Sequence, residues 1–261
     1  MKMNPMRGNK NIHELASIFS LFNSSQTGEK SASEICNELG MYPSKASRIL
    51  SALESEGFME KNPESGKYRI GIRFLELGMI YITNFPLRKI IRPHLEQMAK
   101  ETKLTASMAI LRGERIICID KIQNLNLDIL TQSLGLNSPI YSTSNGKIFL
   151  AFLSEKEREE ILDHLVFIKF TEKTIVDRQL LKEHLQAVRE NNYATDQGET
   201  YENINCMAAP VKDETGKVIA TINLMGSTSI IKADDLFEMA GYLKDKALFI
   251  SRQFGYRSDL G

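Results

Sequence analysis

The chain has 261 residues, 42% hydrophobic and 25% charged, which is ordinary for a globular protein of one or two domains. Its 33 lysines and arginines balance its 33 aspartates and glutamates, so net charge identifies no partner. The sequence has no apolar run long enough to cross a membrane, no signal-peptide core and only three scattered cysteines, which exclude a membrane protein and a disulfide framework. We therefore expect a soluble cytoplasmic protein.

The N-terminal segment is predicted to be a helix-turn-helix. Residues 12–40 show two short amphipathic helices. Ser31 followed by Glu34 is a capping box that opens the second helix, and Gly40 ends it. Pro43 suits the first position of a third helix. Three helices with a tight turn before the third are typical of DNA-binding proteins.

The third helix, predicted over 43–56, has an apolar stripe on one side and an unusually bare polar face on the other. A solvated helix would normally carry Glu and Lys pairs there. Small hydroxyls let a helix approach a DNA major groove, where an arginine can bond guanine in bidentate fashion. The alternative is a solvated helix of an unrelated bundle. We predict DNA contacts from five residues: Ser44, Lys45, Ser47, Arg48 and Ser51.

The next segment, "FMEKNPESGKYRIG", alternates with period two around a turn, which predicts a β-hairpin. A helix-turn-helix followed by a hairpin is a winged helix. Lys61, Lys67 and Arg69 lie on or near the wing and are predicted to contact phosphate, the alternative being ordinary surface charges. Residues 1–75 carry 10 lysines and arginines against 8 glutamates, a net +2 that agrees weakly with a nucleic-acid partner.

Residues 72–85 are apolar on most sides, which predicts a helix that packs against another helix, for instance its own copy. The C-terminal part alternates paired strands with helices, and "CMAAPVKDETGKVIATINLMG" is a clear hairpin. "LDILTQ" is predicted as a further strand. The predicted fold is α+β, with a winged helix-turn-helix at 1–71, a linker and dimerisation helix at 72–85, and a sheet flanked by helices at 86–261.

Several of these fragments in order resemble the IclR family of bacterial transcriptional regulators. They include "ASEICNELGMYPSKASRILSALESEGF", "RPHLEQMAKET", "NGKIFLAFLSEKE" and "NYATDQGE". The resemblance implies a GAF-like C-terminal domain that binds a small-molecule effector. It also implies a homodimer or dimer of dimers on a palindromic or repeated operator in double-stranded DNA, with repression as the expected outcome.

"SNGK" opens an apolar helix, whose first N–H groups can bind an anion or can simply be capped by Ser144. The resemblance implies an effector pocket there. Serines are common in the family at the positions of Asn223 and Met225, and Met225 makes the pocket more apolar, so we expect a small, partly hydrophobic carboxylate. The implied effector-binding residues are Ser144, Asn145, Gly146, Asp196, Cys206, Asn223 and Met225.

Two other classes of function are weighed against this reading. An enzyme with Cys206 as its nucleophile would need an activating histidine, and the four histidines show no such pattern. P-loop, metalloprotease, hydrolase and dinucleotide motifs are missing, so we expect no catalytic residue, no metal and no cofactor. A protein-interaction module whose winged helix does not bind DNA remains the alternative, and salt-sensitive DNA affinity would distinguish it.

Overall fold

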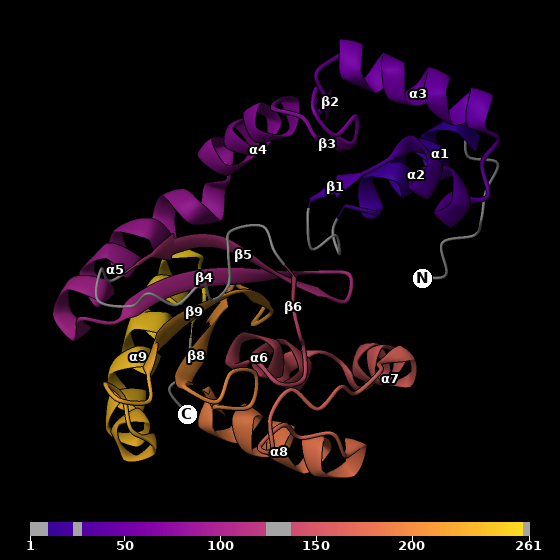
Figure 1. Cartoon of the computed structure of the whole chain (residues 1–261). Helices are drawn as coiled ribbons and strands as arrows, with labels where there is room; N and C mark the ends of the chain where they lie inside the picture. Colours follow the sequence, from indigo (N-terminus) through magenta and orange to yellow (C-terminus); the bar gives the residue numbers. More distant parts are fainter. Residues whose placement is uncertain (1–9, 23–27, 124–136, 258–261) are drawn as a thin grey trace. The chain divides into compact units, whose positions relative to one another are not determined.

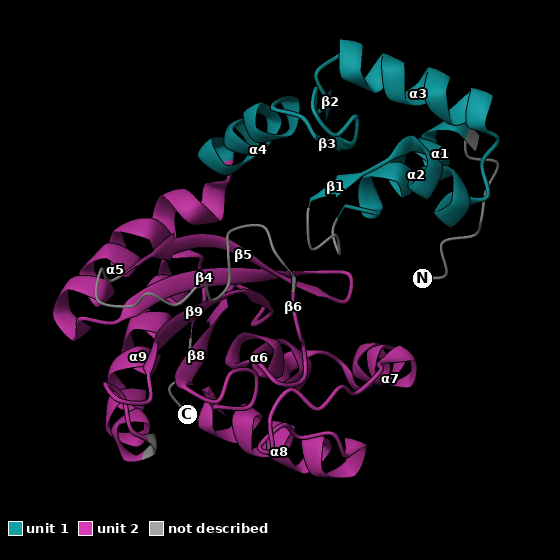
Figure 2. Cartoon of the chain, in the orientation of Figure 1, with its two compact units in different colours: residues 1–84 teal, residues 85–261 magenta. Residues whose placement is uncertain are grey.

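The chain folds into two compact units, residues 1–84 and residues 85–261 (Figure 2). The structure is a computed structural model that describes residues 10–22, 28–123 and 137–257. Each unit has its own hydrophobic core. The predicted α+β fold is confirmed.

The first unit opens with three helices: α1 (Lys10–Ser20), α2 (Ala32–Leu39) and α3 (Pro43–Ser55) (Figure 1). The predicted capping box of α2 is present, since the Ser31 hydroxyl accepts a hydrogen bond from the backbone of Glu34 and the Glu34 carboxylate accepts one from the backbone of Ser31. Gly40 ends α2 at a left-handed φ of 62°, which glycine adopts without steric cost. The helix-turn-helix is therefore confirmed.

The wing is a small antiparallel sheet in the order β1-β3-β2. Its strands are β1 (Glu29–Lys30), β2 (Met59–Lys61) and β3 (Tyr68–Ile70). β2 and β3 form the predicted hairpin, and Tyr68 is buried in the core between them and the helices. β1 pairs with β3 and was not predicted, because a strand of two residues is too short to show a period of two.

Helix α4 (Arg73–Asn84) follows the wing and confirms the helix predicted at 72–85. Phe74 packs edge to face on Phe19 and Phe58, with ring centroids 4.8 and 5.4 Å away, which attaches the start of α4 to the winged helix. No residue of α4 is buried in the chain as described. Its exposed apolar side chains are Leu75, Leu77, Met79, Ile80 and Tyr81.

The second unit is built on an antiparallel sheet in the order β6-β5-β4-β9-β8-β7. The strands are β4 (Thr105–Arg112), β5 (Arg115–Ile122), β6 (Asn137–Ser138), β7 (Ala194–Gln197), β8 (Ile204–Lys212) and β9 (Val218–Ser227). β8 and β9 are the predicted hairpin around "DETGK". The strand predicted at "LDILTQ" lies outside the described residues.

Helices cover both faces of this sheet (Figure 1). On one face lie α5 (Pro86–Thr102) and α9 (Ala233–Gln253), whose apolar residues share a core with alternate residues of β8 and β9. On the other face lies α6 (Ser144–Phe152), which packs against α8 (Arg178–Asn191), with α7 (Glu155–His164) beside them. Residues of the central strands are therefore buried on both sides, and a polar group there needs a partner.

Candidate functional site

From Ser44 to Ser51 the outer face of α3 carries small hydroxyls and Arg48, as the sequence predicted, and one exposed carboxylate, that of Glu54, follows in the last turn. Its apolar stripe is buried, with Ala46 and Leu50 fully covered. Arg48 makes no ion pair with the described residues, so its guanidinium can bond an external partner. The predicted DNA-contacting residues that are exposed on this face are Ser44, Ser47, Arg48 and Ser51.

Lys45 differs from the other four candidates of α3. Its amine pairs with the Glu14 carboxylate of α1 at 2.5 Å, and both side chains are partly buried. The pair joins the first and third helices of the winged helix. The positive charge of Lys45, which was expected to face DNA, is thus already paired within the unit. The spacing of residues along α3 could not reveal this pair, because Glu14 is 31 residues away in the sequence.

The wing cations are also unequal. Arg69 pairs with Glu60 on the neighbouring strand, with nitrogen and oxygen 2.9 Å apart. Lys61 lies over the Tyr68 ring, 5.6 Å from its centroid, and makes no ion pair with the described residues. Lys67 likewise has no ion pair with a described carboxylate. Lys61 and Lys67 are therefore better placed than Arg69 to meet a phosphate.

The implied effector-binding strand residues lie on one face of the second unit's sheet. Directly paired residues share a face, and so do residues two apart along a strand. The register gives two adjacent rows: Asp196, Cys206, Met225 and Thr105 in one, and Ala194, Ala208, Asn223, Ser107 and Lys121 in the other. This is the face that α6 covers.

Side chains at the start of α6 form hydrogen bonds with this face. Asn223 Nδ2 donates to Ser144 Oγ at 2.9 Å. The Thr221 hydroxyl donates to Asn145 Oδ1 at 2.9 Å, while Asn145 Nδ2 is buried without a hydrogen-bond partner among the described residues. A buried donor without a partner is costly, which makes it a candidate for binding a ligand acceptor. We call these residues and Ser107, whose hydroxyl donates to Asn223 Oδ1 at 3.4 Å, the α6 polar cluster.

Asp196 lies beside the cluster in a tight turn. Its carboxylate accepts hydrogen bonds from the backbone of Glu199 at 2.7 Å and from the Thr200 hydroxyl at 2.9 Å. Burial raises the pKa of Asp196, and these bonds partly oppose that rise. Cys206 and Met225 pack with Ile204 in a small apolar cluster. The structure therefore brings the implied strand residues together on one face of the sheet. Asp196 and Asn223 make its polar part, and Cys206 and Met225 make its apolar part.

Gly146 has a packing role that the sequence did not indicate. A Cβ built on Gly146 would lie 2.1 Å from the carbonyl oxygen of Ile140, so glycine is needed there for close packing of the chain on itself. Ser144 is also not the cap of α6. Thr143 is the N-cap, and its hydroxyl accepts a hydrogen bond from the backbone of Gly146 at 3.2 Å.

Lys121 was missed by sequence reasoning. It pairs with Ser107 across β5 and β4 and thus lies on the face that carries Asn223. Its charge acts on the Cys206 thiol, as does that of Asp196, so the two charged groups lie near the same sulfur. Burial lowers the pKa of Lys121. The period-two alternation of β5 could have indicated which face Lys121 is on. However, a bulge between Met108 and Ala109 shifts the register of the β4–β5 pair, and the sequence does not show this shift.

The Cys206 thiol is expected to react slowly. Burial raises its pKa well above the ordinary value, with the charge of Asp196 acting in the same direction, and alkylation requires the thiolate. Iodoacetamide at neutral pH should modify Cys206 at least about tenfold more slowly in the folded chain than after denaturation. Mass spectrometry of the alkylated peptides would measure both rates. Equal rates would contradict a buried, unreactive thiol.

A helix-turn-helix with a β-hairpin wing, followed by a separate α+β unit, defines a winged-helix regulator of transcription. A sequence model described as "Bacterial transcriptional regulator IclR C-terminal" matches residues 79–252, and the "IclR helix-turn-helix domain" matches residues 15–63. The chain therefore belongs to the IclR family of bacterial transcriptional regulators.

Similar proteins extend over nearly the whole chain. HTH-type transcriptional regulator XynR of Escherichia coli is 29% identical over 247 residues, 95% of this chain and 98% of XynR. HTH-type transcriptional regulator KdgR of Escherichia coli is 30% identical over 223 residues, 85% of each chain. The crystal structure of Thermotoga maritima IclR has a TM-score of 0.71 at 30% identity, covering 94% of this chain and 100% of that one.

Membership places this protein among DNA-binding regulators with an effector-binding C-terminal domain, not among enzymes. Within residues 10–22, 28–123 and 137–257, no helix is long and apolar enough to cross a membrane. Among these described residues, no three or more His, Cys, Asp or Glu side chains are grouped so that they could hold a metal ion.

Proposed function

We propose that this protein is a repressor that binds a palindromic or repeated operator through α3 and the wing, and whose DNA affinity a small carboxylate effector controls. The observation that carries the DNA-binding half is the exposed face of α3, where Arg48 lies among small hydroxyls and forms no ion pair with any residue that the structure describes. Ser44, Ser47 and Ser51 suit base-edge or phosphate contacts, and Arg48 suits guanine. Lys61 and Lys67 add phosphate contacts from the wing, while Lys45 and Arg69 have their charges already paired with Glu14 and Glu60 and should contribute less.

A homodimer through α4 would give two winged helices for two half-sites. The exposed fractions of Leu75 and Ile80 are 60% and 62%, and such apolar exposure on one helix supports packing on a second copy. The effector would act by binding one spacing of the two winged helices more tightly than another. A ligand with equal affinity for both arrangements would shift nothing.

The proposed effector site is the α6 polar cluster together with Asp196, Cys206 and Met225. Asn145 Nδ2 offers a buried donor, and Lys121 brings a positive charge to the same face of the sheet. Cys206 and Met225 provide an apolar wall. Donors and a cation opposite an apolar wall favour a small acid with a short hydrophobic part.

Selection of bound duplexes from a random DNA pool at near-physiological salt tests the DNA-binding half. Enrichment of one palindrome or repeat by the full chain is the expected result, and its half-site spacing would report the geometry of the dimer. Failure to enrich any sequence, both alone and with pooled metabolites, would favour a protein-interaction module instead. The selected duplex is then the probe for the effector.

For the effector, small carboxylates should be compared with their neutral amides in calorimetric titrations. We expect one acid to bind at least about tenfold more tightly than its amide, and Lys121→Met to remove that preference. Lys217→Met, which removes an exposed lysine of the β8–β9 turn, is the matched control. Tight binding of a neutral ligand, with no heat from any acid, would refute the carboxylate assignment.

A further inference from the structure

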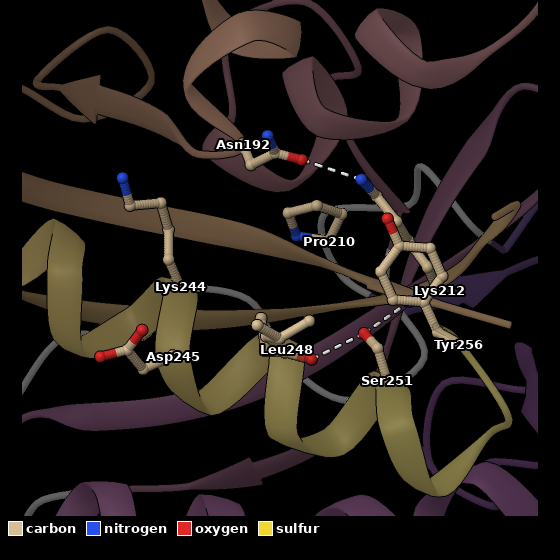
Figure 3. Close-up of a pocket in the computed structure, with 9 residues that line it drawn as sticks. Asn192, Pro210, Lys212, Lys244, Asp245, Leu248, Ser251 and Tyr256 are labelled. Carbon is tan, nitrogen blue, oxygen red and sulfur yellow. Dashed lines mark hydrogen bonds between the residues drawn. The ribbon is translucent and has the colours of Figure 1, made fainter. Parts of the chain in front are cut away.

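A cavity of about 250 Å³ lies in the second unit, away from the proposed effector site (Figure 3). It lies between α9, the end of β8 and Asn192, the C-cap of α8. β7 pairs with β8 only as far as Ala208, so the later residues of β8 are at the edge of the sheet. The polar residues of its lining are Asn192, Lys212, Lys244, Asp245, Ser251 and Tyr256.

Two lysine amines belong to this cavity without a carboxylate partner. Lys212 Nζ donates to Asn192 Oδ1 at 2.8 Å, and Figure 3 shows the amine directed at that amide. Lys244 extends from α9 with its amine 5.7 Å from the centroid of the Tyr193 ring. Neither lysine forms an ion pair with a carboxylate of the described residues.

Among the described residues, the charge around this cavity is unbalanced in favour of cations. Arg189 lies close enough to Lys212 for the two positive charges to repel each other, and it too has no ion pair with the described residues. Burial, and secondly the charge of Arg189, lower the pKa of Lys212. Asp245 is the only carboxylate among the described residues of the lining, and in Figure 3 it points away from the Lys212 amine.

Aromatic rings hold Lys212 in place. Its amine lies 4.5 Å from the centroid of the Phe152 ring and 5.5 Å from that of Tyr256. The backbone N–H of Lys212 donates to the buried Ser251 hydroxyl at 2.9 Å, which ties this end of β8 to α9. The cation is therefore preorganised by side chains that supply no negative charge, and it retains two ammonium protons for another acceptor.

We propose that this cavity is a second small-molecule site, which binds a small dianion, a phosphate or a dicarboxylate, between Lys212 and Lys244. The Asn192 amide and the Tyr256 hydroxyl are further donors in the lining. Such an anion would offset the repulsion between Lys212 and Arg189 and would connect α8 to α9. The site is apart from Asn223 and Ser144 of the α6 polar cluster, because Lys212 is four positions along β8 from Ala208, the partner of Asn223, roughly 13 Å at about 3.3 Å per residue.

The test is titration of the full chain with inorganic phosphate and, separately, with succinate, at constant ionic strength, with acetate as a monoanion control. Calorimetry and the thermal unfolding midpoint are the readouts. We expect saturable binding of at least one dianion and little binding of acetate. Phosphate alone would assign a phosphate ligand, and succinate alone a dicarboxylate.

Variants identify the site. Lys212→Met and Lys244→Met, which keep much of the side-chain volume, should each weaken binding at least about tenfold. Asp245→Asn should tighten it several-fold, a gain that misfolding cannot mimic. Lys156→Met, an exposed lysine of α7, and Asn223→Ala, in the α6 polar cluster, should leave it unchanged. The proposal would be overturned if Lys212→Met and Lys244→Met bound the dianion as tightly as the unmodified chain. Loss of dianion binding in Asn223→Ala, or no saturable binding of either dianion, would overturn it too.

Discussion

Arg48→Ala is expected to weaken binding of the full chain to its selected operator by about 1–3 kcal/mol, or roughly 5- to 150-fold in Kd. Arg48 is exposed on α3 and unpaired within the described residues, so the variant loses an external contact and no internal one. The free energy of unfolding should therefore change by less than about 0.5 kcal/mol. Fluorescence anisotropy with the selected duplex at fixed salt would measure the affinity.

Three matched variants make this result specific. Arg48→Lys keeps the charge but loses the bidentate geometry, so most of the affinity loss should remain. Lys67→Ala should instead weaken all duplexes about equally and reduce the slope of log affinity against log salt by about 1. Arg112→Ala, exposed at the end of β4, removes a charge from the second unit and should have no effect. Unchanged affinity of Arg48→Ala for its operator would remove α3 as the reading helix.

Elements that depend on local pattern were predictable. Signals at helix ends act within a few residues: the capping box at Ser31, the left-handed Gly40 and Pro43 at the start of α3. Helices α2 and α3, whose ends these residues mark, lie where they were predicted. The β8–β9 hairpin was likewise visible, because both strands and the turn are contiguous in sequence.

Partners distant in sequence were not predictable. Lys45 is near Glu14 only because α1 and α3 pack together, 31 residues apart in sequence, and its spacing on α3 gave it the same appearance as Arg48. The packing role of Gly146 could not be foreseen, because the sequence does not show that the Ile140 carbonyl fills the space where a Cβ would lie. Lys121 joins the ligand face through a register that includes a bulge. Tertiary packing decided all three.

Lys147 is the largest such omission, since sequence reasoning gave it no role. It is fully buried in α6, donates to the Thr195 carbonyl at 3.0 Å and forms a short ion pair with Glu199, which is also buried. The second carboxylate oxygen of Glu199 has no hydrogen-bond partner among the described residues. Removing the lysine would therefore leave an uncompensated buried carboxylate.

Lys147→Met is expected to lower the free energy of unfolding by about 3–5 kcal/mol at pH 8. The loss should shrink as pH falls. Burial raises the pKa of Glu199 from 4.5 to about 6, and Lys147 is the cation that opposes this rise, so its removal raises the pKa further. A carboxyl whose pKa is raised in the folded state holds its proton there after the unfolded chain has lost it, so stability falls as pH rises through that window. Asp196, whose raised pKa Lys147 also opposes, acts in the same direction.

A second substitution distinguishes the ion pair from packing. Lys147→Met with Glu199→Gln removes the buried charge together with its partner, so it should recover most of the lost stability and flatten its dependence on pH between 5 and 8. Urea unfolding of each variant across this range provides the measurement, with Lys156→Met as the control for loss of an exposed lysine. A Lys147→Met penalty that is the same at pH 5 and pH 8, and that persists in the double variant, would mean that lost packing around α6 causes the destabilisation. Recovery in the double variant would instead show that Lys147 neutralises Glu199 where α6 meets the β7 turn, a few residues from Ser144, Asn145 and Asp196 of the proposed effector site.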